Sequence, residues 1–307
     1  MEQTLQDILI AAGALVVVIM LFAAAACAAR RKNRGEIPIT RPPATTGLSS
    51  TFDPKQVSMA ELEKATHNFS PDLIIGCGSF GSNRVLVYEY VKNGSLDKWL
   101  LLGRKQDLIK IAETPRSSRL PLSWETRIKI VRGVASGLAY MHNLKTPIIH
   151  RNIKASKVLL DSDFEPHIGD FGFARIIDGS LSHVSTRVAG TMGYMPPEYI
   201  HGATMATAMG DVYSFGILML EISTGIRPDL PFKQERNGKE VRLVEWAREK
   251  LAQNLHMEIL DANISRAGLE ESGVVEFLRI ALLCASYSSK DRPPMREVVE
   301  LLNRIPT

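Results

Sequence analysis

The stretch DVYSFGILMLEIST at 211–224 constrains the fold of this chain more than any other, because it is apolar on every side of a helix. A helix that is apolar all round is buried in the core of a protein or in a membrane. A membrane span needs about 20 apolar residues, and this stretch is shorter. We therefore predict that it forms the central helix of a core, with other elements packed around it.

Several other segments have the periodicity of helices that cover such a core. The segment WETRIKIVRGVASGLAYMH at 124–142 carries two apolar rows, which indicates a well-buried helix. Amphipathic helices are predicted at 242–253, 274–286 and 294–305. This part of the chain is therefore expected to be mainly helical.

The residues before this helical part have a different pattern. A strand leading into a glycine-rich turn is predicted at 73–82, and a β-rich apolar run at 84–91. Ahead of them, 57–69 has helical spacing, and Ser58 with Glu61 three residues later forms the pattern of a capping box. The fold class is thus α+β, with a small β part and a larger helical part.

A second long apolar stretch, 8–29, has 22 residues without a charge, which is enough to cross a bilayer as a helix. The basic run RRKNR at 30–34 follows directly, so the positive-inside rule places the rest of the chain in the cytoplasm. A cleaved signal peptide is the alternative, because small residues at 23–29 offer a cleavage site, but signal peptides carry their positive charge before the apolar run. We expect a single-pass anchor in the plasma membrane.

Composition excludes some function classes. The 307 residues are 45% hydrophobic and 23% charged, with a net charge of +4, much of it in the run at 30–34, so nucleic-acid binding is not expected. Cys27, Cys77 and Cys284 have neither metal-ligand nor disulfide spacing, which is typical of reduced cytosolic thiols.

Short motifs along the chain carry the chemistry. The loop GCGSFGS at 76–82 matches the G-x-G-x-x-G pattern, in which glycines let backbone N–H groups approach phosphate oxygens. Further motifs follow in the order and at the spacing of a protein kinase: His150-Arg151, Lys154, Asp170-Phe171-Gly172, Pro196-Pro197-Glu198, Asp211 and Arg292.

From Val57 to the C-terminus the sequence resembles the intracellular part of plant leucine-rich-repeat receptor-like serine/threonine kinases. ELEKATHNFS, VYEYVKNGSLDKWL, HVSTRVAGTMGYMPPEY and GDVYSFGILMLEISTG are typical of that family, and the resemblance covers about four-fifths of the chain. Residues 1–307 contain no leucine-rich repeat. The resemblance implies a two-lobed protein-kinase-like fold that uses ATP and Mg²⁺.

The resemblance also assigns expected roles to individual residues. Tyr88 would be the gatekeeper, Glu89 and Val91 would face adenine, and Leu159 would form the floor of that pocket. Asp170 would bind the metal, Asp211 would brace the catalytic loop, and Glu198 would pair with Arg292. The phosphate loop would comprise Gly76, Gly78, Ser79, Phe80 and Gly81.

Two positions of the catalytic loop depart from the family pattern. Asn152 stands where the pattern has the aspartate that accepts the proton of the substrate hydroxyl, next to Arg151 and two residues before Lys154. Lys157 stands where the pattern has a metal-binding asparagine, so an ammonium replaces an oxygen ligand. We expect Lys157 to approach nucleotide phosphates directly, and we expect ATP and magnesium to bind weakly.

The small lobe is also reduced. Ser82 is followed almost at once by the hinge run at 84–91, so the strand with the phosphate-gripping lysine and the helix with its glutamate partner are missing. The resulting division comprises a short extracytoplasmic N-terminus at 1–7, the transmembrane helix at 8–29, a linker at 30–56 and a kinase-like domain at 57–307, with a small-lobe remnant at 73–91 and a large lobe at 92–305.

The segment between Asp170-Phe171-Gly172 and Pro196-Pro197-Glu198 corresponds to the one that active relatives phosphorylate. Its candidate phosphosites are Ser180, Ser182, Ser185, Thr186 and Thr191. A phosphate there could pair with the guanidinium of Arg151, and a merely solvated loop is the alternative.

Two functions remain open at this point. The first is a membrane-anchored pseudokinase that binds active receptor-like kinases or their substrates and contacts lipid through its anchor. The second is a weakly active serine/threonine kinase. A degenerate or mis-spliced gene copy would carry the same motifs.

Overall fold

The computed structural model describes residues 58–70, 87–100, 120–177, 184–185, 190–202, 205–229, 231–233 and 240–306. The predicted transmembrane helix at 8–29, the linker at 30–56 and the glycine-rich loop at 76–82 lie outside these residues. Among the described residues, no helix is both long and apolar enough to cross a membrane. The chain forms two units, Met1–Val85 and Leu86–Thr307.

The described part of the first unit contains helix α2, Met59–Ala65. Its capping box is present, because Ser58 Oγ accepts from the Glu61 amide at 3.3 Å and the Ser58 amide donates to Glu61 Oε2 at 2.8 Å. The helix is shorter than the predicted range 57–69. The last residues of that range, including Phe69 with a φ of 55°, form a turn beyond the C-terminus of the helix. The predicted helix is therefore confirmed over its first half.

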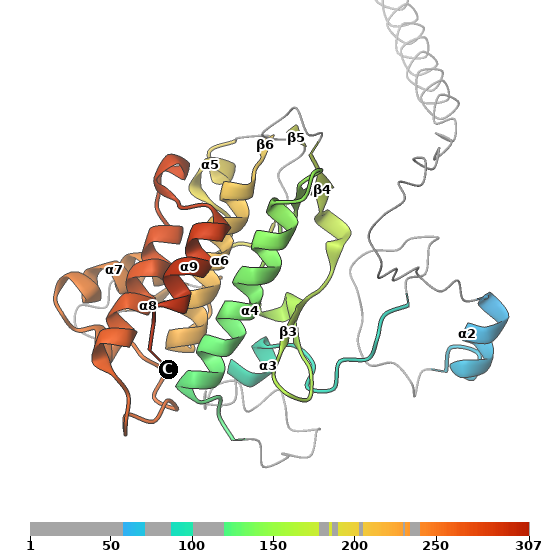
Figure 1. Ribbon diagram of the computed structural model, residues 1–307, viewed down its shortest axis with the longest axis horizontal. Coiled ribbons are helices and arrows are strands. Elements are labelled where there is room, and N and C mark those ends of the chain that lie inside the picture. Colours follow the sequence, from blue (N-terminus) through green and yellow to red (C-terminus); the bar gives the residue numbers. More distant parts are fainter. Residues whose placement is uncertain are drawn as a thin grey trace, which may run out of the picture. The chain divides into compact units, whose positions relative to one another are not determined.

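Helix α6, Ala208–Thr224, is the centre of the second unit, and every residue from 210 to 224 is buried. It packs against α4, Trp124–His142, and against helices from the C-terminal part of the chain (Figure 1). Gly216 permits this close approach, since a Cβ atom added there would lie 2.6 Å from the Ala281 carbonyl oxygen. The predicted central buried helix is confirmed.

The other predicted helices are also present. Helix α4 begins after Ser123, whose Oγ accepts from the Thr126 amide at 3.2 Å, and its bounds match the predicted range. Helix α8, Glu271–Cys284, begins and ends slightly earlier than the predicted range 274–286. Its first turn includes polar residues that lie outside the apolar periodicity. The remaining helices of this unit are α3, Asp97–Leu100, α5, Pro197–Ile200, α7, Leu243–Ala252, α8, Glu271–Cys284, and α9, Met295–Asn303.

The described strands are short and form antiparallel pairs. β1, Ile148–Ile149, pairs with β4, Arg175–Ile176, and β2, Val158–Leu160, pairs with β3, Pro166–Ile168. The other two pairs are β5, Val184–Ser185, with β6, Met205–Ala206, and β7, Phe232–Lys233, with β8, Glu240–Val241. The pair β1–β4 borders the segment from 150 to 174, and the pair β2–β3 lies within it. This segment contains the catalytic-loop motif and Asp170-Phe171-Gly172.

The prediction of a strand at 84–91 is wrong for residues 87–91, the part of this run that the structure describes. Residues 87–91 belong to no strand, and Val87, Tyr88 and Tyr90 are 59%, 67% and 71% exposed. An extended apolar run becomes a stable strand only when a neighbour pairs with it and covers one face. No described strand pairs with 87–91.

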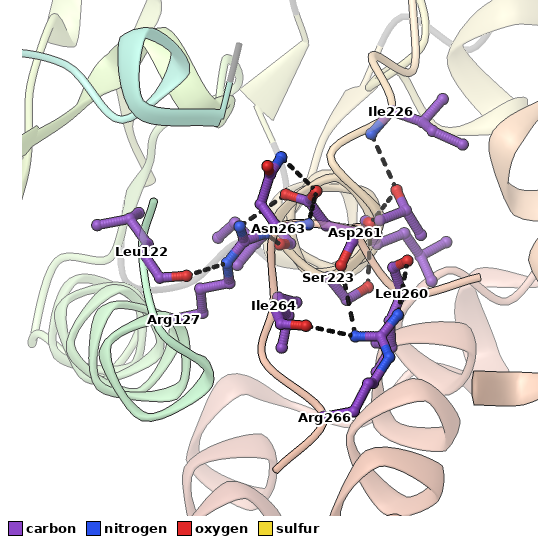
Figure 2. A network of polar contacts seen from close by, with 12 residues as sticks. Leu122, Arg127, Ser223, Ile226, Leu260, Asp261, Asn263, Ile264 and Arg266 are labelled. Carbon is purple, nitrogen blue, oxygen red and sulfur yellow. Dashed lines mark hydrogen bonds and ion pairs between the residues drawn. The ribbon is translucent and has the colours of Figure 1, made fainter. Parts of the chain in front are cut away.

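A buried polar network joins α4 to the end of α6 (Figure 2). The Arg127 guanidinium donates to the carbonyl oxygens of Leu122 and Ile222 at 3.0 and 2.5 Å, and to Asp261 Oδ2 at 2.6 Å. The Asp261 amide in turn donates to the Ser223 carbonyl at 2.9 Å. Burial lowers the pKa of Arg127, and Asp261 offsets part of that shift. The network fixes the C-terminal end of α6 relative to α4.

Candidate functional site

The catalytic-loop motif is held by a buried carboxylate on α6. Asp211 is 1% exposed, and its two oxygens accept from the backbone amides of His150 and Arg151, both at 2.7 Å. His142, the last residue of α4, places its Nε2 3.0 Å from Asp211 Oδ2. Arg151 has a φ of 69°, a strained value for a non-glycine residue, which the two hydrogen bonds to Asp211 stabilise. The expected contact between Asp211 and the loop backbone is present.

His150 connects the catalytic loop to the Asp-Phe-Gly segment. Its Nε2 lies 3.1 Å from the Gly169 carbonyl oxygen, and its Nδ1 accepts from the Asn152 amide at 3.3 Å. This pattern requires a proton on Nε2 and none on Nδ1, so the ring is neutral. Burial lowers the pKa of His150, which agrees with a neutral ring. The ring also meets Phe171 edge to face at 5.1 Å.

Asn152 is 6% exposed at the position where the family pattern has its base. Its Oδ1 accepts a hydrogen bond from the Thr191 hydroxyl at 2.8 Å. Lys154 is half-buried nearby, and its pKa is lowered by burial and then by the positive charge of Lys157. A carboxamide has no proton-accepting group at neutral pH, so Asn152 cannot act as a general base.

Lys157 and Asp170 form an ion pair. Lys157 Nζ donates to Asp170 Oδ2, while Asp170 Oδ1 accepts from the Gly172 amide at 3.2 Å. The hydrogen bond from Lys157 is the main cause that lowers the pKa of Asp170. That Lys157 reaches nucleotide phosphates stays a prediction; in the structure its ammonium contacts the carboxylate of Asp170.

Arg292 binds Glu198, the last residue of the Pro196-Pro197-Glu198 motif. It donates to both carboxylate oxygens of Glu198 at 2.7 Å, and also to the carbonyl oxygens of Ser286 and Met209 at 2.8 and 2.9 Å. Its guanidinium lies 4.9 Å from the centre of the Tyr213 ring. The expected pairing of Glu198 with Arg292 is present, in the bidentate geometry that favours arginine.

The residues expected at an adenine pocket lie on two segments, 88–91 and β2, and their role in binding adenine stays a prediction. Tyr88 and Glu89 are exposed, Val91 is half-buried, and Leu159 lies in β2 with a single bridge to Ser95. Two cavities on the described residues, of about 440 and 610 Å³, are lined by other residues, on α9 and between α7 and α8. The five glycine-loop residues at 76–81 lie outside the described part.

The candidate phosphosites are described only in part. Thr191 is half-buried, and its hydroxyl is engaged with Asn152. The backbone of Ser185 lies in β5, whereas Ser180, Ser182 and Thr186 lie outside the described residues.

Sequence reasoning missed two contacts of this region. His142 appeared only as the end of a helix, although it holds Asp211. The hydroxyl of Tyr194 donates to Glu221 Oε2 within the core. The sequence singles out Glu221 as the one acidic residue within the apolar part of DVYSFGILMLEIST after Asp211, but it does not indicate that Tyr194 is its partner.

The catalytic-loop scaffold and the helices around it are those of a protein kinase large lobe, and the protein kinase domain family model matches residues 56–301. The leucine-rich repeat receptor protein kinase EMS1 of Arabidopsis thaliana is 43% identical over 80% of this chain and 20% of its own length. Phytosulfokine receptor 2 of the same organism is 34% identical over 82% of this chain and 28% of its own length. The EPD1-interacting receptor-like cytoplasmic serine/threonine-protein kinase 5D of Gossypium barbadense is 40% identical over 75% of this chain and 46% of its own length.

The chain therefore belongs to the plant receptor-like kinases, within the protein kinase domain family. It spans between about a fifth and a half of the length of these curated relatives.

Proposed function

We propose that this protein is a catalytically impaired receptor-like kinase homologue, anchored in the plasma membrane through 8–29, that acts in signalling by binding active receptor-like kinases or their substrates. The observation that carries the proposal is the environment of Asn152. A neutral carboxamide occupies the base position, and its oxygen already accepts the Thr191 hydroxyl. General-base catalysis typically contributes about 10²–10⁴-fold to a rate, and that contribution is lost.

The small lobe supports the same proposal. No lysine lies between Gly81 and the hinge run at 84–91 to grip the α- and β-phosphates, and the glutamate that would orient such a lysine has no counterpart. The exposed residues at 87–90 agree with a small lobe that lacks its usual strands. We therefore expect ATP to bind no more tightly than about the millimolar range.

A weakly active serine/threonine kinase is the second candidate. It is favoured by the intact scaffold of the catalytic loop, in which Asp211 orients His150 and Arg151 as a working loop would require. A positioned loop supplies orientation but no proton acceptor, which is why we favour the impaired kinase homologue.

The test is co-expression of the full-length chain with the cytoplasmic domain of an active plant receptor-like kinase, followed by affinity purification and mass spectrometry. We expect a complex, and phosphate on the candidate residues at 180–186. Thr191 should be modified least, because its hydroxyl is half-buried and donates to Asn152. An Asp170→Asn variant should bind the partner equally well, since binding does not depend on catalysis by this chain.

Two results would contradict the proposal: no complex with any of several active relatives, or a complex that forms only when this chain phosphorylates its partner.

A further inference from the structure

The ion pair between Lys157 and Asp170 lies where the family holds a divalent metal ion. We infer that the Lys157 ammonium is a built-in cation that takes the place of the metal, so that this chain does not bind Mg²⁺ at Asp170 and holds its Asp-Phe-Gly segment in place without a ligand. The inference deepens the proposed function and rests on its interpretation of Asp170 as the family's metal-binding position.

The backbone brings the two side chains together. Lys157 ends a short 3₁₀ turn, Ala155–Lys157, and is followed directly by β2, while Asp170 comes two residues after the end of β3. The two strands pair antiparallel with Val158 opposite Ile168. The Gly169 amide extends this ladder by donating to the Lys157 carbonyl oxygen at 2.8 Å. The strand register therefore places Lys157 opposite Gly169 and next to Asp170, whose side chain it reaches.

Both oxygens of the Asp170 carboxylate are engaged within the chain. Oδ2 accepts from the ammonium, and Oδ1 accepts from the Gly172 amide. Asp170 has a φ of 62°, and its side chain caps the 3₁₀ turn Phe171–Phe173. The pair is partly exposed, with 25% of the Lys157 side chain and 36% of the Asp170 side chain accessible, so metal ions in solution can reach it.

The residues present do not fit Mg²⁺. Magnesium takes oxygen ligands in near-octahedral geometry, and here one of the family's two oxygen ligands is replaced by a positive charge. Lys154 adds a second positive charge, and its pKa is lowered by burial and then by the charge of Lys157. Among the described residues there is no group of three or more His, Cys, Asp or Glu side chains that could hold a metal ion. A metal ion would have to displace the ammonium and then face two lysines.

Contacts within the chain hold three residues in and next to the Asp-Phe-Gly motif in place. Asp170 is fixed by Lys157, Phe171 packs against the ring of His150, and the carbonyl oxygen of Phe173 accepts from Arg151 at 3.1 Å. Each of these partners belongs to the chain itself. The segment accordingly needs neither nucleotide nor metal to keep this arrangement.

The first test is thermal unfolding of the purified full-length chain in about 10 mM MgCl₂, with NaCl of equal ionic strength as the reference. We expect no change in Tm for the native chain. Lys157→Asn restores an oxygen ligand. We expect the Tm of this variant to rise by about 2–4 °C in MgCl₂, which corresponds to a Kd for Mg²⁺ roughly tenfold below the metal concentration. The added change Asp170→Asn should abolish that rise.

Lys129→Asn is the matched control, because Lys129 forms an exposed ion pair with Glu165 at 2.9 Å. The Tm of this variant should not respond to MgCl₂. The inference is overturned if the native chain gains Tm in MgCl₂ and loses the gain with Asp170→Asn. It is equally overturned if Lys157→Asn responds no more than the native chain.

The second test is hydrogen exchange of the amides at 169–174 in the absence of metal. Lys157→Met keeps the length of the side chain and removes its charge. We expect these amides to exchange at least about tenfold faster in that variant, while Lys129→Met leaves them unchanged. Unchanged exchange in Lys157→Met would show that the ion pair does not hold the segment. Neither test measures phosphoryl transfer, so an active but metal-insensitive chain would contradict the proposed function alone.

Discussion

Glu221 is a carboxylic acid in the middle of α6, with 5% of its surface exposed. Burial raises its pKa to about 7, and Asp97 and Asp229 act in the same direction, whereas the Tyr194 hydrogen bond and Arg227 oppose the shift. The Glu221 side chain is therefore protonated in the folded state over a pH range in which it is ionised in the unfolded chain. This difference makes the stability of the fold depend on pH.

We expect native stability to fall between about pH 4.5 and pH 7 because of Glu221. A carboxyl group whose folded pKa is raised contributes stability below its unfolded pKa, and the contribution is lost as pH rises through the folded pKa. The size of the effect is on the order of 3 kcal/mol. Urea unfolding of native and Glu221→Gln chains from pH 5 to 8 should show the native chain losing stability relative to the variant; parallel curves would contradict this.

At the scale of residues, the sequence predicted which groups are missing but not what the replacements do. Asn152 and Lys157 were identified as departures from the motif alone. The partner of Lys157 was not, because it depends on the register between β2 and β3, which brings Asp170 beside it. The contact between Tyr194 and Glu221 likewise joins positions that no local pattern connects.

At the scale of elements, α6 and α8 approach closely because Gly216 has no side chain. A Cβ atom there would lie 2.6 Å from the Ala281 carbonyl oxygen and 2.7 Å from the Ala285 amide nitrogen. Both contacts are to backbone, which cannot move aside as a flexible side chain would. Gly273, on α8 itself, has only ordinary contacts at 3.5 Å or more.

Gly216→Ala should therefore destabilise the fold by about 1–3 kcal/mol through overpacking. Gly273→Ala is the matched control and should be neutral or stabilising by up to about 1 kcal/mol, since alanine has the higher helix propensity. Chemical denaturation of both variants measures the two effects. A Gly216→Ala chain as stable as the native one would show that α8 can move away from α6 at little cost.

Helices were predicted better than strands for a physical reason. The apolar rows of α4 and α6 are properties of single segments, so the sequence locates both helices. A strand depends on its partner, and the run at 87–91 is apolar but has no described strand beside it. The short pairs such as β1–β4 carry too few residues for a periodic signal.

At the scale of the whole molecule, the Arg127 network connects distant parts of the chain. The ion pair with Asp261 joins residues 134 positions apart, and the two side chains are 1% and 8% exposed. Removing one partner of a buried ion pair leaves an uncompensated charge, which typically costs about 3–5 kcal/mol. The network should therefore affect the stability of the whole second unit.

Asp261→Asn should lower the free energy of unfolding by about 3–5 kcal/mol, because Arg127 then stays buried without a counter-charge. Arg127→Met combined with Asp261→Leu should cost less than either change alone. Glu165→Gln, which breaks the exposed pair with Lys129, is the control and should cost less than about 1 kcal/mol. Urea unfolding would decide, and equal effects at the two pairs would contradict the role assigned to the buried network.

We expect this receptor-like kinase homologue not to transfer phosphate at an appreciable rate, and a phosphoryl-transfer assay measures this directly. Purified full-length chain is incubated with radiolabelled ATP and Mg²⁺, with Asp170→Asn as the blank. We expect no incorporation above the blank, and none after Asn152→Asp, because the phosphate-gripping lysine is still missing. Magnesium-dependent incorporation by the native chain that Asp170→Asn abolishes would show that the protein is an active kinase.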